Sequence, residues 1–174
     1  MTTPQIKYDP SKIVPQELWD LDKIRTEPLR ARVRWEDAKD GPGGLVKRQE
    51  IYYTSHVWRG QAIRIAAHVA LPQAKGKLPV MVLGSGSLDS AESFARTHNV
   101  ACIAIDRPGT GDSNGPGDIY QTWIALEEDP RDGWMWHYVT SVLRAITYMQ
   151  QQAEMDGAKV GVTGGSRGGT MSLI

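Results

Sequence analysis

Three short apolar runs in the second half of the chain constrain its fold most strongly. They lie within residues 79–87, 100–106 and 158–164, and each has the length of a strand that is covered on both faces. Amphipathic patterns typical of helices separate them, at residues 87–99 and 133–154. Strands and helices that alternate in this way are typical of a parallel sheet with helices on both faces.

Two further strands are predicted upstream, at residues 45–55 and 61–72, joined by the short link HVWRG. In the second of these, alternate positions place five apolar side chains on one face: Ile63, Ile65, Ala67, Val69 and Leu71. Both strands would extend the sheet, partly in antiparallel fashion. The sequence therefore predicts an α/β fold with a mostly parallel, doubly wound sheet over residues 45–174.

Residues 1–44 differ in character and read as an N-terminal extension. Pro4, Pro10, Pro15 and Pro28 interrupt this stretch, and one short helix is expected from Pro15 to Arg34. The run DAKDGPGG at residues 37–44 is a turn-rich boundary.

Charge and cysteine content narrow the classes of partner. Lys plus Arg and Asp plus Glu number 20 each, so the formal net charge is zero. We therefore expect neither a nucleic acid nor a membrane partner, and no run approaches the roughly 20 apolar residues that span a bilayer. The single cysteine, Cys102, excludes an internal disulfide and is expected in the core. A polar N-terminus without an apolar signal core favours the cytoplasm, with a processed secreted form as the alternative.

The third apolar run leads directly into Gly164-Gly165-Ser166-Arg167-Gly168. A sharp turn from strand to helix needs small residues two before and two after its apex, and it exposes the apex side chain at the carboxyl edge of the sheet. The pattern therefore predicts a nucleophilic hydroxyl on Ser166. A plain glycine-rich turn is the alternative. A phosphate-binding loop is disfavoured because G-x-x-x-x-G-K-[ST] is absent.

Two other segments fit this picture, the loop LGSGS at residues 83–87 and DRPGTGDS at residues 106–113. Together with the G-G-S-R-G-G turn, their order along residues 45–174 resembles the α/β-hydrolase superfamily. The likeness is greatest to the acetyl xylan esterase and cephalosporin-C deacetylase branch, or to dienelactone-hydrolase-like and prolyl-peptidase-like relatives.

The resemblance implies a serine hydrolase with no cofactor and no metal. Ser166 would be the nucleophile, and the amides of Arg167 and Gly86 would hold the oxyanion, with Ser85 as the alternative to Gly86. The substrate would be a small-molecule ester. Gly84 stands where this superfamily often has a histidine.

The superfamily places its acid and its histidine after the nucleophile, yet no Asp, Glu or His follows Ser166. The four histidines, His56, His68, His98 and His137, are expected to be structural or at the surface. Residues 45–174 therefore resemble the N-terminal half of a hydrolase domain, truncated after the nucleophile turn. We expect the last strand to be an apolar sheet edge covered by a C-terminal complementing segment or a dimer partner.

Three functions follow from these observations. The first is a serine ester hydrolase for small acyl esters, present as an incomplete chain that depends on a missing segment. The second is a non-catalytic remnant or interaction module with the same fold, and the third is a prolyl-type peptidase.

Two smaller groups of side chains have both a functional and a structural interpretation. Trp123, Trp134 and Trp136 could line a pocket, but aromatic residues at a helix start favour the core. Asp112 and Asp118 could bind a cation, but solvated carboxylates are more typical of such a loop.

Overall fold

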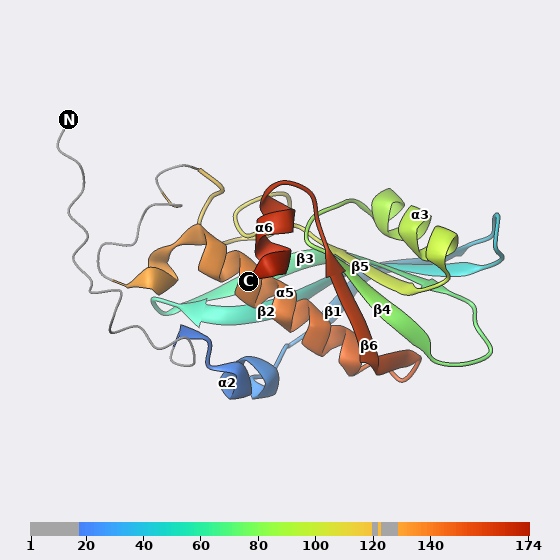
Figure 1. Cartoon of the computed structure of the whole chain (residues 1–174), viewed down its shortest axis with the longest axis horizontal. Helices are drawn as coiled ribbons and strands as arrows, with labels where there is room; N and C mark the ends of the chain where they lie inside the picture. The colour runs from blue at the N-terminus through green and yellow to red at the C-terminus, as the bar shows by residue number, and fades with distance from the viewer. Residues whose placement is uncertain (1–17, 120–121, 123–128) are drawn as a thin grey trace.

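The fold is built on one six-stranded sheet (Figure 1). The computed structural model describes residues 18–119, 122 and 129–174. The strands are β1 (Arg32–Lys39), β2 (Val46–Trp58), β3 (Gln61–Pro72), β4 (Leu78–Leu83), β5 (Ala101–Ile105) and β6 (Met155–Thr163). Their order across the sheet is β1-β2-β3-β5-β4-β6. The five strands expected from the sequence are thus confirmed, with ends that shift by a few residues.

The sheet is mixed, which corrects the expectation of a mostly parallel one. Three neighbouring pairs, β1–β2, β2–β3 and β3–β5, are antiparallel, and only β5–β4 and β4–β6 are parallel. The turn between β2 and β3 consists of Arg59 and Gly60, with φ of 45° and 81°. Such a two-residue turn can only return the chain antiparallel. The parallel strands are those whose connections contain a helix.

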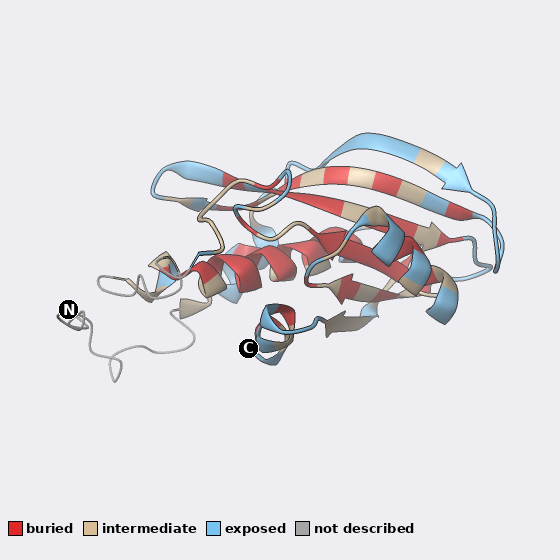
Figure 2. Ribbon diagram, turned by 90° about the horizontal axis from the view of Figure 1, so that it is seen from above, coloured by how far each residue is buried: buried red, intermediate tan, exposed pale blue. Residues whose placement is uncertain are grey.

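The two long helices pack on different faces of the sheet. They are α3 (Leu88–His98) and α5 (Trp134–Gln150). Along β3, the side chains of Ile63, Ile65, Ala67 and Val69 share the larger apolar cluster with α5, whereas Ala70 shares a smaller cluster with α3. The predicted face of this strand and the expectation of helices on both faces are therefore confirmed. Figure 2 shows that α5 is buried along most of its length.

The N-terminal region differs from expectation. The helix there, α2, covers only Leu21–Thr26, and β1 follows it and pairs with β2. The helix expected from Pro15 to Arg34 is therefore confirmed only over Leu21–Thr26, and its first residues, 15–17, lie outside the described residues. Pro28 cannot donate a backbone hydrogen bond and disfavours helical backbone just before it, so the helix ends upstream.

Two short elements complete the described chain, the 3-10 helix η2 (Pro130–Asp132) and the final helix α6 (Arg167–Leu173). As expected, α6 is a short helix and β6 is an edge strand among the strands of the described residues. None of the described helices has both the length and the apolar character that a bilayer crossing requires.

Candidate active site

Three loops meet at one edge of the sheet. Because β4, β5 and β6 run parallel, their carboxyl ends lie at the same edge. Residues 84–87, 106–118 and 164–166 follow these ends. Ligands bind at this edge in open α/β sheets, so all three candidate segments from the sequence are brought together there.

Ser166 sits at the turn between β6 and α6 in a strained conformation. Its φ of 53° and ψ of −116° lie in a region that residues with a side chain rarely adopt, at a cost of about 1–3 kcal/mol. The residue is exposed, and its hydroxyl makes no hydrogen bond to a described residue. A hydroxyl held outward on strained backbone is accessible to a molecule that approaches from solvent.

The glycines around Ser166 have different reasons to be small. A Cβ on Gly164 would lie 2.6 Å from the carbonyl carbon of Gly168, and one on Gly169 would lie 3.2 Å from the carbonyl oxygen of Gly164. The strand and helix therefore meet too closely for side chains at these positions. A Cβ on Gly165 would meet open space, so the expected steric requirement does not extend to that residue.

The loop after β4 offers two backbone donors at this edge. The amide of Gly84 donates to the Thr163 carbonyl (2.9 Å), and that of Ser87 donates to Ser90 Oγ (3.4 Å). Within the described residues the amides of Ser85 and Gly86 donate no hydrogen bond. These are the two amides that the sequence singled out as candidates for the second oxyanion donor.

Tyr138 explains why the first residue of that loop is glycine. A Cβ on Gly84 would lie 2.6 Å from both Tyr138 Oη and Met171 Cε, so a histidine would not fit there. Tyr138 itself is fully buried on α5, and its hydroxyl meets the geometric requirements of a hydrogen bond with none of the described residues. Burial raises the pKa of this phenol to about 12, so it remains protonated.

The DRPGTGDS loop is fastened by its own side chains. The carboxylate of Asp106 accepts a hydrogen bond from the Asp112 amide (2.9 Å). Ser113 Oγ donates to the Asp106 carbonyl and accepts from the Ala66 amide, each at 2.9 Å. Gly111 is required because a Cβ there would lie 2.2 Å from the Asp106 carboxylate. The motif thus shapes the loop after β5.

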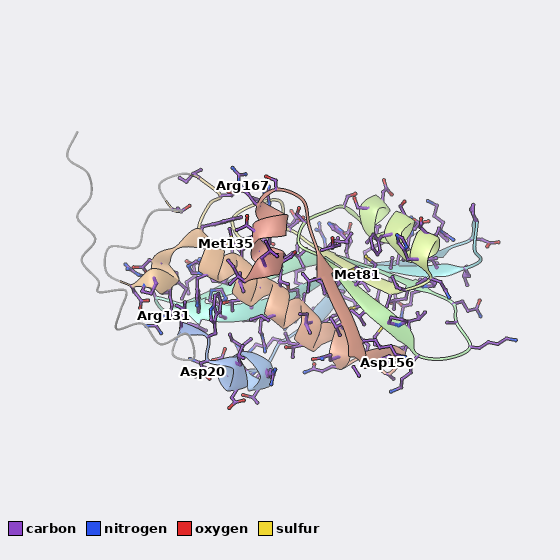
Figure 3. The ribbon with its side chains drawn as sticks, viewed as in Figure 1. Asp20, Met81, Arg131, Met135, Asp156 and Arg167 are labelled. Atoms are coloured by element: carbon purple, nitrogen blue, oxygen red, sulfur yellow. The ribbon has the colours of Figure 1, made fainter. Side chains whose placement is uncertain are left out.

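Asp118 connects this loop to the turn at Ser166. Its side chain is only 6% exposed, and Oδ2 lies 3.0 Å from Nη1 of both Arg107 and Arg167. Figure 3 shows Arg167 at the start of α6. Asp118 is therefore an ion-pair bridge rather than a solvated turn carboxylate. Asp112 instead pairs with Arg34 (2.5 Å), and the described residues contain no cluster of three or more side chains that could hold a metal ion.

None of the four histidines hydrogen-bonds Ser166, and each has other contacts. His56 lies on β2 rather than in the hairpin link, and its Nε2 is 2.8 Å from Nδ1 of His137 on α5. Burial lowers the pKa of His56 to about 3 and that of His137 to about 4. His68 lies 3.8 Å from Asp106, which raises its pKa, and exposed His98 packs on Phe94. Nothing in the sequence had indicated the pairing of His56 with His137.

Of the three tryptophans considered as pocket residues, Trp134 belongs to the core and Trp136 is half-buried. Trp134 is fully buried and donates from Nε1 to the Pro108 carbonyl (3.1 Å), which anchors the loop after β5. Trp136 stacks on Trp19 with ring centroids 6.0 Å apart. Trp123 lies outside the described residues.

Solved structures of esterases share this architecture, although no match is found at the level of sequence. No protein-family model matches the chain, and no curated protein matches its sequence. Among solved structures, acetyl xylan esterase 1 from Thermoanaerobacterium sp. JW/SL YS485 aligns with a TM-score of 0.71 at 22% identity, over 91% of this chain and 52% of that one. The acetyl xylan esterase from Paenibacillus sp. R4 gives 0.70 at 22% identity, over 98% and 56%.

More distant structures share the same architecture. A glucuronoyl esterase from Solibacter usitatus aligns with a TM-score of 0.59 at 14% identity, over 99% of this chain and 59% of that one. A dienelactone hydrolase-like phosphotriesterase from metagenomic libraries gives 0.54 at 18% identity, over 74% and 52%. The chain thus has the fold of the N-terminal portion of an α/β-hydrolase. It spans about half the length of the solved proteins that it resembles.

Proposed function

We propose that this chain carries the nucleophile of a serine ester hydrolase. The observation that supports the proposal most directly is the backbone of Ser166, strained and exposed between β6 and α6. A plain glycine-rich turn would have no need to hold a serine at positive φ, because an adjacent glycine could adopt that conformation at lower cost.

The chemistry is acyl transfer. Ser166 Oγ attacks the ester carbonyl, its proton passes to a base, and the carbonyl oxygen becomes an oxyanion. The amides of Arg167 and Gly86 donate to this oxygen, with Ser85 as the alternative to Gly86. Collapse of the tetrahedral intermediate expels the alcohol and leaves an acyl-enzyme, which water then hydrolyses.

The base and its acid come from outside the described residues in this proposal. The four histidines of the chain make their contacts elsewhere, and none hydrogen-bonds Ser166. A complementing segment or a partner subunit would supply the pair. Small acyl esters, such as acetyl esters of sugars, are the proposed substrates, a choice supported by the likeness to acetyl xylan esterases.

A fluorophosphonate probe tests the proposal on the product of the complete reading frame. We expect covalent labelling at Ser166, located by peptide mass spectrometry, together with hydrolysis of p-nitrophenyl acetate. Ser166→Ala should abolish both, whereas Ser93→Ala, at an exposed position on α3, should change neither. A wild-type product that folds but remains unlabelled would favour the non-catalytic interaction module instead.

A further inference from the structure

A closed ring of hydrogen bonds joins β2 to α5 inside the molecule, away from Ser166. His56 Nε2 lies 2.8 Å from His137 Nδ1, and His56 Nδ1 lies 2.8 Å from Ser55 Oγ. Ser55 Oγ in turn lies 3.2 Å from Ser141 Oγ, which is 2.7 Å from the carbonyl oxygen of His137. All four residues are buried. The ring therefore begins at the imidazole of His137 and ends at the carbonyl oxygen of the same residue.

Only one arrangement of protons satisfies the ring. The Ser141 hydroxyl donates to both Ser55 Oγ and the His137 carbonyl, which share its single proton. Ser55 also accepts from His56 Nδ1–H, which leaves His56 Nε2 as an acceptor for His137 Nδ1–H. The reverse order would place the His137 proton on Nε2. It would bury that N–H at an atom that has no partner among the described residues.

The ring has no place for an additional proton. A proton on His56 Nε2 would face the N–H of His137 across 2.8 Å, and a proton on His137 Nε2 would be buried without an acceptor. No carboxylate of the described residues lies within ion-pair distance of either ring. The charged group that acts on His56 is the buried guanidinium of Arg144 on α5, which adds repulsion.

The other elements around the rings offer no compensating charge. From β2 the neighbour is Trp58, which carries the Arg59 guanidinium over its ring. Arg59 pairs in turn with Asp132 of η2 (3.0 Å). On the N-terminal side Trp19 stacks on Trp136, which contacts both imidazoles, and Asp20 beside Trp19 caps α2. The hydrogen bond between His56 and His137 is consequently stable only when both imidazoles are neutral.

The ring also supports the segment that precedes α2. The Trp136 indole packs edge-on against His56, with centroids 5.0 Å apart, and stacks on Trp19. Its Nε1 donates to the Leu18 carbonyl (3.0 Å). We infer that the Ser55–His56–His137–Ser141 ring is an acid-sensitive lock, which holds the segment at Leu18 and Trp19 on α5 at neutral pH and releases it on acidification. The inference does not depend on the proposed esterase function.

Nitrogen-15 NMR of the histidine side chains of the unmodified chain tests the lock directly. We expect His56 and His137 to be neutral Nδ1–H tautomers at pH 7 and to remain neutral until the lock opens. Hydrogen–deuterium exchange, corrected for its intrinsic pH dependence, should rise at residues 18–27 between pH 7 and pH 5. Nε2–H tautomers, titration near pH 6.5 in the folded chain, or unchanged exchange at residues 18–27 would each overturn the inference.

A conservative variant provides the second readout. In His137→Asn the side-chain amide can still donate to His56, but the residue no longer titrates. Each histidine of the pair should lower the folding equilibrium constant about 20-fold between pH 7 and pH 5. Between pH 7 and pH 5 the folding equilibrium constant of His137→Asn should therefore fall about 20-fold less than that of wild type. His98→Asn, at an exposed site on α3, should behave as wild type. Equal pH dependence in His137→Asn and wild type would contradict the lock, and if the variant does not fold, the NMR result decides.

Discussion

Close contacts around Ser166 limit which amino acids can occupy the neighbouring positions, independently of any role in a reaction. Ser166 is held at positive φ, and Gly164 and Gly168 touch where β6 passes into α6. Tyr138 fills the space beneath Gly84, and within the described part of the chain its hydroxyl makes no hydrogen bond. These residues determine the shape of the site before any substrate is considered.

Replacement of Gly164 tests the close approach at the turn. Gly164→Ala should lower the free energy of unfolding by about 1–3 kcal/mol, because the new Cβ would overlap the backbone of Gly168. Urea denaturation measures this loss. Gly165→Ala is the matched control, and its effect should stay within about 0.5 kcal/mol because its Cβ would meet open space. Similar losses in both variants would argue against the described packing.

Two buried tyrosines should respond to the loss of a hydroxyl in opposite ways. Tyr53 Oη donates to the Ser141 carbonyl (2.7 Å), so Tyr53→Phe should cost about 1 kcal/mol of unfolding free energy. Tyr138→Phe removes a buried hydroxyl that hydrogen-bonds to none of the described residues and should be neutral or stabilising by about 1 kcal/mol. Thermal and urea unfolding of the two variants under one buffer condition would reveal the difference. A destabilised Tyr138→Phe would show that the Tyr138 hydroxyl makes a stabilising hydrogen bond.

Among the elements, α5 connects the largest number of separate parts. It anchors the loop after β5 through Trp134, joins β2 through His137 and Ser141, and holds α2 through Arg144. The Arg144 guanidinium is fully buried and donates to the carbonyls of Ile24 and Glu27. A helix of six residues such as α2 is not stable unaided, so its persistence depends on this contact.

Removal of that contact should loosen α2 locally. In Arg144→Met, amide exchange across Leu21–Glu27 should become at least tenfold faster, because hydrogen bonds from a charged donor contribute about 1.5–3 kcal/mol each. Arg131→Met is the matched control, since Arg131 is exposed and pairs only with Asp129 in the described structure. Hydrogen–deuterium exchange with mass spectrometry provides the measurement. Unchanged protection of α2 would show that other contacts hold it.

The molecule as a whole has one markedly apolar side. A groove of about 750 Å³ runs between α2, α5, β6 and α6, lined by Trp19, Asp20, Leu21, Asp22, Arg25, Val139, Val142, Leu143, Ile146, Val162, Met171, Ser172 and Ile174. Ser166 does not line it. The groove adjoins the edge strand β6, whose outer backbone groups have no strand partner in the described sheet. Apolar grooves beside open sheet edges favour association.

Self-association of the 174-residue chain is therefore expected. Sedimentation velocity should show a sedimentation coefficient that rises with concentration. Ile146→Lys places a charge in the groove and should weaken association at least tenfold, whereas Ile119→Lys, at an exposed position elsewhere, should not. A chain that stays monomeric at its solubility limit would contradict this expectation.

Local sequence patterns determined much of the secondary structure of this protein, independently of its tertiary contacts. The order of five strands, the helices α3 and α5 and the turn at Ser166 follow from side-chain periodicity and from the spacing of Gly164 and Gly168. Interactions of this kind join residues that are close in sequence, and their geometry is therefore readable from the sequence.

Tertiary structure alone decided the remainder. Strand β1, the antiparallel half of the sheet, the bridge from Asp118 to Arg167, the Tyr138 hydroxyl beneath Gly84 and the ring through His56 and His137 depend on which distant residues meet. The bridge joins residues that are 49 positions apart in the sequence, and the histidine pair joins residues that are 81 positions apart. No local period encodes them, because they form only once the sheet brings its strands and α5 together.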